Sequence, residues 1–157
     1  MMLLRPDELV ITGAVATPGT VWRTSALHAR ACRPLAIDYV TRRRTERHEV
    51  RGVPLYEALT LTGLALDPAR KMDYLRLAVL AEGADGYGAL LSYAELHPEF
   101  GDCGAMLATW HNGQLLTRPT LVMPADRRAS RFVRQLHRLQ VTNPSASNPP
   151  APNLSTP

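Results

Sequence analysis

The 157-residue chain has little of what most often marks a chemical site. Its two cysteines, Cys32 and Cys103, lie far apart and lack the spacing of a zinc site, and they can form at most one disulfide. No apolar run is long enough to cross a bilayer. The chain also lacks a Ser-His-Asp arrangement, a phosphate loop and a paired-carboxylate motif. We therefore expect no membrane span and no metal site.

Lysine is almost missing, and so is an apolar leader. Lys71 is the only lysine among 18 basic residues, which face 14 acidic ones and give a net charge of +4. A GC-rich genome explains an arginine surplus without any function; alternatively, arginine is selected because its planar group binds phosphate or carboxylate at two points. Residues 1–9 contain no apolar stretch of signal-peptide length. As it stands the sequence predicts a cytoplasmic protein, and a periplasmic one if a leader has been removed.

Apolar patterns and turn residues predict an α+β fold of one domain, a size that suits the length and the 45% apolar content. Strands are expected over residues 8–15, 35–40, 73–81, 106–110 and 121–123, and a hairpin over 42–50. Short helices are expected from Ser25 up to Pro34, and over 56–61 with Gly63 at the end. Ser92 and Glu95 have the spacing of a capping box.

Two stretches near the C-terminus are harder to interpret. Over residues 127–141 the arginines recur on one helical face, which predicts an amphipathic helix, but the alternation over 135–141 equally suits a strand. Residues 143–157 contain five of the thirteen prolines and no charged side chain. Such a segment cannot bury enough surface to offset its ordering entropy, so we expect a disordered tail after a domain of residues 1–142.

Several motifs follow one another in a characteristic order over residues 8–141. They are Gly13 and Pro18, Gly52-Val53-Pro54-Leu55, Ala84-Asp85-Gly86-Tyr87, Ala94-Glu95-Leu96, Asn112-Gly113-Gln114-Leu115, residues 121–126, and Arg131-Phe132-Val133. This ordered set resembles the molybdopterin-binding oxidoreductase domain of sulfite oxidase and related enzymes, above all the short, single-domain bacterial members. The resemblance implies a mixed α+β fold with several small sheets, a closing strand over residues 135–141, and molybdopterin as cofactor.

The chain departs from this family at the metal. In full members a cysteine thiolate binds molybdenum just after the strand that precedes the Gly-Val-Pro-Leu motif. Here Thr41 or Arg42 takes that place, and neither supplies the soft sulfur that the metal needs. Neither Cys32 nor Cys103 is expected to move into the role. The resemblance therefore predicts a molybdopterin-binding, oxidoreductase-like protein without standard sulfite-oxidase catalysis.

The residues that the resemblance places near the cofactor fall into three stretches. They are Thr41, Arg42, Arg43, Arg44 and His48 beside the pterin and its phosphate, Asp85 and Tyr87 near the substrate pocket, and Arg118 facing an anion in the same cleft. Each also has a plainer explanation. The arginines suit a solvated hairpin, Asp85 and Tyr87 suit a tight turn, and Arg118 suits an exposed strand end.

Two other functions remain open. The first is a non-catalytic module on the same fold that binds a small anionic ligand or a protein partner. The second is a basic nucleic-acid-binding protein, which ranks last because Phe132 is the only aromatic residue near the C-terminal arginines. A single ring offers no platform on which successive bases can stack.

Overall fold

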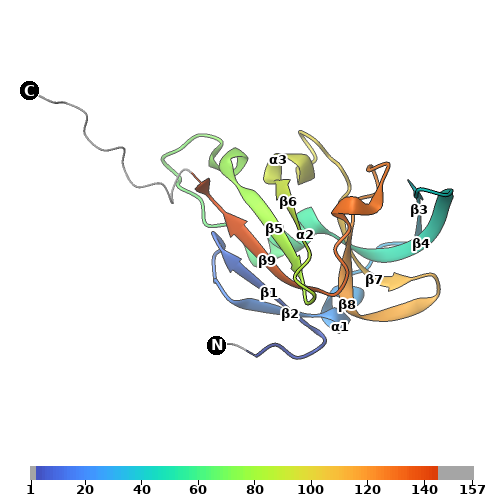
Figure 1. Cartoon of the computed structure of the whole chain (residues 1–157). Helices are drawn as coiled ribbons and strands as arrows, with labels where there is room; N and C mark the ends of the chain where they lie inside the picture. The colour runs from blue at the N-terminus through green and yellow to red at the C-terminus, as the bar shows by residue number, and fades with distance from the viewer. Residues whose placement is uncertain (1–2, 145–157) are drawn as a thin grey trace, which may run out of the picture.

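The computed structural model describes residues 3–144 and contains two β-sheets joined by short helices (Figure 1). The five-stranded sheet has the order β2 (Thr20–Arg23), β1 (Glu8–Gly13), β9 (Leu136–Thr142), β5 (Ala78–Gly83) and β6 (Gly88–Ser92). The four-stranded sheet has the order β3 (Leu35–Val40), β4 (Thr45–Pro54), β7 (Met106–His111) and β8 (Gln114–Val122). The predicted tail, apart from Asn143 and Pro144, lies outside the described residues.

The two sheets differ in how their strands run. All pairs of the four-stranded sheet are antiparallel. In the five-stranded sheet β9 lies parallel to β1 but antiparallel to β5, so this sheet is mixed. Parallel neighbours cannot be joined by a tight hairpin. The chain accordingly passes through both sheets between β1 and β9, which holds the two sheets together.

Short helical segments connect the strands. They are α1 (Thr24–His28), α2 (Leu55–Thr62), α3 (Tyr93–Leu96) and the 3₁₀ turns η1 (Asp73–Arg76) and η2 (Ala129–Arg131). The predicted capping box is present, because Ser92 and Glu95 bond to each other's backbone N–H. Gly63 ends α2 with a φ of 85°, as expected. The predicted α+β class is confirmed, and within residues 3–144 no helix is long and apolar enough to cross a membrane.

Two groups of buried side chains stabilise this arrangement. The larger one packs between the five-stranded sheet, α2 and one face of the four-stranded sheet, with Leu59, Leu107 and Leu139 fully buried. The smaller one lies on the opposite face of the four-stranded sheet and consists of Ile37, Val50, Met106, Ala108 and Val122. Phe132 packs against both groups from the segment between η2 and β9.

Some local predictions were wrong. The predicted strand over residues 73–81 begins only at Ala78, because Met72 adopts a left-handed conformation and Asp73 starts a 3₁₀ turn. The helix over 127–141 is not formed; the strand that the resemblance implied is present as β9. The helix from Ser25 is shorter than expected and ends at His28. Two short strands, β2 and β6, were not predicted as strands.

Candidate functional site

A cavity of about 300 Å³ lies over the outer face of the four-stranded sheet. The alternation of each strand places Ile37 and Tyr39 of β3 on this face, next to His48 and Val50 of β4. The floor is the smaller buried group, so it is apolar. The rim is polar and aromatic and consists chiefly of Tyr39, His48, His111, Arg118, Phe132 and Arg134. We call this the sheet cavity.

A second cavity of about 280 Å³ adjoins the sheet cavity. Tyr39, Phe132 and Arg134 line both, so they form the boundary between the two spaces. Tyr39 and Phe132 meet edge to face with their ring centres 5.4 Å apart. The second cavity adds Asp85 and Tyr87. Four of the predicted site residues thus lie in these two adjoining cavities. His48 and Arg118 line the sheet cavity, and Asp85 and Tyr87 line the second cavity.

Asp85 and Tyr87 also have structural roles in the β5–β6 turn. Oδ1 of Asp85 accepts a hydrogen bond of 3.0 Å from the backbone N–H of Tyr87. The hydroxyl of Tyr87 donates to the backbone carbonyl of Ser130. These contacts join the turn to the segment that carries Phe132 and Arg134, so the turn helps to position the wall of the second cavity.

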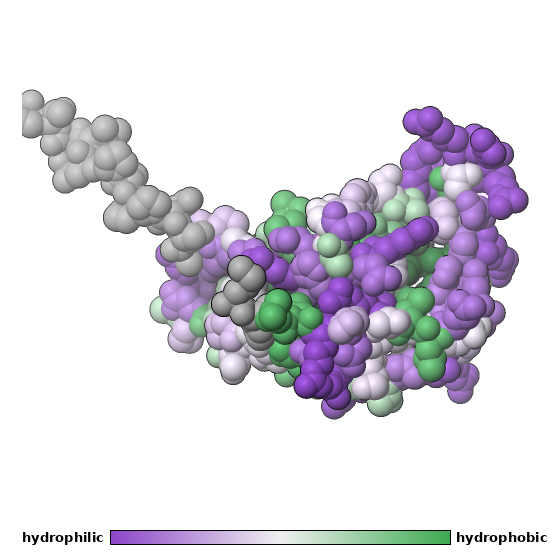
Figure 2. Space-filling model, turned by 60° about the horizontal axis from the view of Figure 1, so that its bottom comes forward, coloured by the Kyte–Doolittle hydropathy of each residue, from purple (hydrophilic) through white to green (hydrophobic). Residues whose placement is uncertain are grey.

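Thr41 and Arg42 to Arg44 lie elsewhere, at the exposed tip of the β3–β4 hairpin. With Glu46 they line a third, open cavity that shares no residue with the other two. Thr41 shapes the tip: its hydroxyl accepts from the N–H groups of Arg43 and Arg44 and donates to the carbonyl of Arg44. In Figure 2 the hairpin is the arm at the upper right, hydrophilic almost throughout. The three arginines of the tip are therefore exposed and separate from the sheet cavity.

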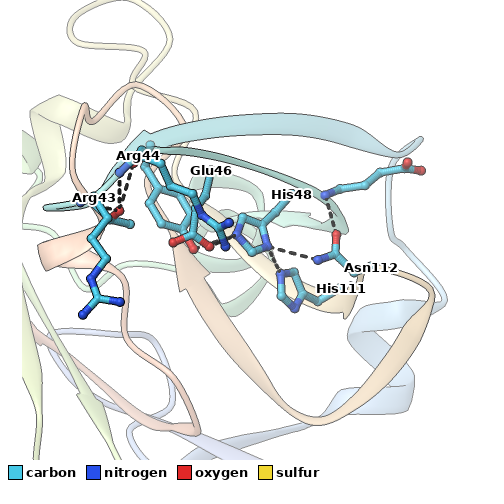
Figure 3. A network of polar contacts seen from close by, with 9 residues as sticks. Arg43, Arg44, Glu46, His48, His111 and Asn112 are labelled. Carbon is cyan, nitrogen blue, oxygen red and sulfur yellow. Dashed lines mark hydrogen bonds and ion pairs between the residues drawn. The ribbon is translucent and has the colours of Figure 1, made fainter.

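His48 is the centre of a polar network at the wall of the sheet cavity (Figure 3). Its Nε2 lies 2.8 Å from the hydroxyl of Tyr39 and 3.3 Å from Oε1 of Glu46. Its Nδ1 lies 2.9 Å from Nε2 of His111 and 3.0 Å from Nδ2 of Asn112. The ring centres of the two histidines are 4.9 Å apart with a tilt of 20°. Since their nitrogens approach to 2.9 Å, the rings meet edge to edge.

The hydrogen bonds around Asn112 assign the protons of this network. Oδ1 of Asn112 accepts from the backbone N–H of Glu49 at 2.8 Å, so Nδ2 is the amide nitrogen that faces His48 and donates to its Nδ1. An Nδ1 that accepts from an amide has no proton of its own. His111 therefore donates from Nε2, and the proton of neutral His48 sits on Nε2, facing Tyr39 and Glu46.

Burial and neighbouring charge shift the pKa of two rings in this wall. Burial lowers the pKa of His111, and His48 and Arg134 lower it further, so the ring is neutral at pH 7. Burial and the carboxylate of Glu46 raise the pKa of Tyr39, which keeps its hydroxyl protonated. At neutral pH the rings of His111 and Tyr39 thus offer uncharged donors and acceptors, while the positive charge at the rim comes from Arg118 and Arg134.

Arg118 extends from β8 at the rim of the sheet cavity. Its Nη2 donates to the carbonyl of Arg5 at 3.1 Å, which anchors one end of the guanidinium. Its Nε is buried and has no hydrogen-bond partner within residues 3–144.

Neither cysteine lies at these cavities. Cys32 is exposed just before β3, and Cys103 is half-buried against the larger core, where burial raises the pKa of its thiol. A thiol with a raised pKa is a poor metal ligand because the thiolate is the binding form. Within the described residues no cluster of three His, Cys, Asp or Glu side chains is placed to hold a metal ion.

Three residues that define the sheet cavity, Tyr39, His111 and Arg134, carry no sequence signal that assigns them to a site. Tyr39 received no role, although its position two residues after Ile37 on a strand puts it on the same face. His111 directly precedes the Asn112-Gly113 turn, and Arg134 is one of the arginines that recur on one helical face over residues 127–141. Their convergence depends on the pairing of β4 with β7 and on the path of the chain before β9, which no local pattern encodes.

Comparison with solved structures shows where this fold has been seen before. The chain is similar to the sulfane dehydrogenase SoxCD from Paracoccus pantotrophus, with a TM-score of 0.64 and 21% sequence identity. The match covers 90% of this chain but 40% of the SoxCD chain. At this identity the likeness shows a shared fold. No family model matches the sequence, and no curated protein does.

Proposed function

We propose that this domain binds a small anionic ligand of the pterin-phosphate class in the sheet cavity, without the thiolate-bound molybdenum of sulfite-oxidase-type catalysis. The observation that carries this proposal is the make-up of the cavity. An apolar sheet face forms its floor, two aromatic rings form one wall, and two arginines stand at its rim. A flat heterocycle suits the floor and the rings, and an anionic group suits the arginines.

The fold supports the ligand class. The motif order resembles molybdopterin-binding domains, and the fold is shared with a sulfane dehydrogenase. The second cavity extends the available space beyond Tyr39 and Phe132, which gives room for a ligand longer than one ring system. The nucleic-acid alternative gains no support, because the exposed arginines of the hairpin tip have no exposed aromatic ring between them.

The metal of that cofactor does not fit the residues present. Thr41, one of the two residues that stand where the resemblance implies the family's cysteine, uses its hydroxyl to hold its own turn together. No thiol lines the three cavities. Because molybdenum is held by soft sulfur ligands in this fold family, we derive no redox step for this chain.

The test is to purify the protein from a host that makes molybdopterin and to measure pterin by fluorescence and molybdenum and tungsten by elemental analysis. We expect pterin in the wild type, and at least a tenfold lower content in Arg134→Gln. Arg30→Gln is the matched control, since Arg30 is exposed and lines none of the three cavities. A wild type that carries no pterin contradicts the proposal. Stoichiometric metal would show that the fold holds it without a cysteine.

A further inference from the structure

We propose that the chain of Glu46, His48 and His111 gives the sheet cavity a proton-accepting position, so that the cavity binds an oxyanion together with one proton. This inference rests on the proposed function, because it concerns the same cavity. It adds the form in which the ligand is held and predicts how its affinity changes with pH.

An added proton has one open position in this network. Nδ1 of His48 already accepts hydrogen bonds from Asn112 and His111, so a proton placed there would face two donors. Nε2 of His48 already carries its proton. Nδ1 of His111 has no hydrogen-bond partner within the part of the chain that the structure describes. It is therefore the open acceptor of the network.

The network stabilises a charged His111. A protonated His111 keeps its donor bond from Nε2 to His48 at 2.9 Å. The Nε2–H of His48 in turn points toward the carboxylate of Glu46, whose Oε1 lies 3.3 Å from Nε2. The negative charge of Glu46 is therefore felt at His111 through the ring of His48. A carboxylate behind a histidine favours positive charge on the hydrogen-bonded pair. Only one of the two rings can be charged, because two protonated rings would set N–H against N–H.

The charge that surrounds His111 decides when it takes up a proton. The titratable or charged groups that face it across the sheet and the cavity are Tyr39 of β3, Glu46 and His48 of β4, Arg118 of β8, and Arg134 before β9. The arginines oppose a further positive charge in the cavity, and burial, positive charge on His48 and Arg134 hold the pKa of His111 down. A bound oxyanion offsets both arginines and can accept from Nδ1–H of His111, so its binding raises that pKa.

Linkage fixes the sign of the pH effect. A ligand that raises the pKa of one group binds most tightly where that group is already protonated. The affinity is therefore highest below the pKa of His111 in the free protein. It falls by up to about tenfold per pH unit between the free and the bound pKa, and levels off above the bound value. The arginines stay charged throughout this range, so they add no pH dependence.

The experiment uses sulfate as the probe, because its charge is constant between about pH 5.5 and about pH 8, where histidine titrates. Sulfate affinity is measured by calorimetry across this range for the wild type, His111→Gln and His137→Gln. Glutamine can still donate to His48 but cannot take up the proton. His137 is a half-buried histidine of β9 that lines none of the three cavities, so its variant should keep the wild-type pH profile.

A second measurement does not depend on any variant. Nitrogen NMR of the wild type should show Nε2 of His48 protonated and Nδ1 bare, and added sulfate should raise the pKa of His111. Equal sulfate affinity at all pH values, or an unchanged pH profile in His111→Gln, overturns the proton coupling while the binding cavity stands. No sulfate binding at any pH also overturns it, and the pterin measurement then judges the proposed function separately.

Discussion

Nη1 of Arg131 donates a hydrogen bond of 2.8 Å to Oε1 of Glu95, and this contact ties the segment before β9 to α3. The same guanidinium bonds both carboxylate oxygens of Asp126, at 2.9 Å and 2.8 Å. Glu95 in turn closes the capping box of α3. A cluster of three charged groups thus holds in place the chain that continues into Phe132 and Arg134 at the cavity boundary.

Arg131→Met should destabilise the fold by about 1–2 kcal/mol. The loss follows from two carboxylates left without their charged donor, and it is limited because 36% of the Arg131 side chain is exposed and water screens the charges. Urea denaturation followed by circular dichroism gives the difference in free energy of unfolding. Arg128→Met, at an exposed arginine nearby, should change it by less than about 0.5 kcal/mol. Equal effects of both variants would contradict the role of the cluster.

Because of the same cluster, part of the free energy of unfolding depends on pH in the acidic range. Burial raises the pKa of Glu95, but hydrogen bonds from Arg131 and Ser92 outweigh it, and the net pKa lies below the ordinary 4.5. A lowered folded pKa means that the stabilisation is complete above pH 4.5 and is lost as the pH falls through the folded value. Denaturant midpoints measured at stepwise lower pH should therefore fall less steeply for Glu95→Gln than for the wild type. A parallel fall would show that Glu95 is not coupled to folding.

Sequence patterns of a few neighbouring residues correctly predicted the elements that depend only on those neighbours. The bounds of β3, the capping box of Ser92 and Glu95, and the end of α2 at Gly63 follow from alternation, side-chain caps and a positive φ. The segment over residues 127–141 shows the opposite case. Its arginine spacing is compatible with a helix. The strand β9 forms instead because it pairs with both β1 and β5 and buries Leu136, Leu139 and Val141 in the larger core.

The site could be predicted only in part for the same reason. The stretch from Arg42 to His48 is rich in basic residues and continuous in sequence, yet strand alternation and the hairpin tip send its members to different surfaces. His48 faces the sheet cavity, whereas Arg43 and Arg44 stay exposed at the tip. Tyr39, His111 and Arg134 come together from three separate segments. Their convergence requires the register of the whole sheet.

Gly52 shows why the Gly-Val-Pro-Leu motif begins with glycine. It lies at an irregularity in the pairing of β4 with β7, and a Cβ placed there would meet the carbonyl oxygen of Leu107 at 2.1 Å. Because that neighbour is backbone, Gly52→Ala should cost more than about 3 kcal/mol in the free energy of unfolding. Gly86→Ala, where there is open space but a φ of 87°, should cost roughly 1 kcal/mol. Thermal melts would contradict this if the two variants proved equally stable.

Thr41→Cys puts a thiol at one of the two positions, Thr41 and Arg42, where the resemblance to sulfite-oxidase-type domains implies the metal ligand, and we expect it to recruit no molybdenum. The hydroxyl of Thr41 is committed to three hydrogen bonds within its own turn, and the third cavity, which it lines, shares no residue with the sheet cavity. A thiol is a weaker donor and acceptor, so the variant should instead lose about 1 kcal/mol of stability. Thr41→Ser, which keeps the hydroxyl, is the control and should lose less. Elemental analysis of protein made in a cofactor-producing host decides the outcome, because molybdenum bound in near-equal amounts to Thr41→Cys would show that a single missing thiol separates this chain from metal binding.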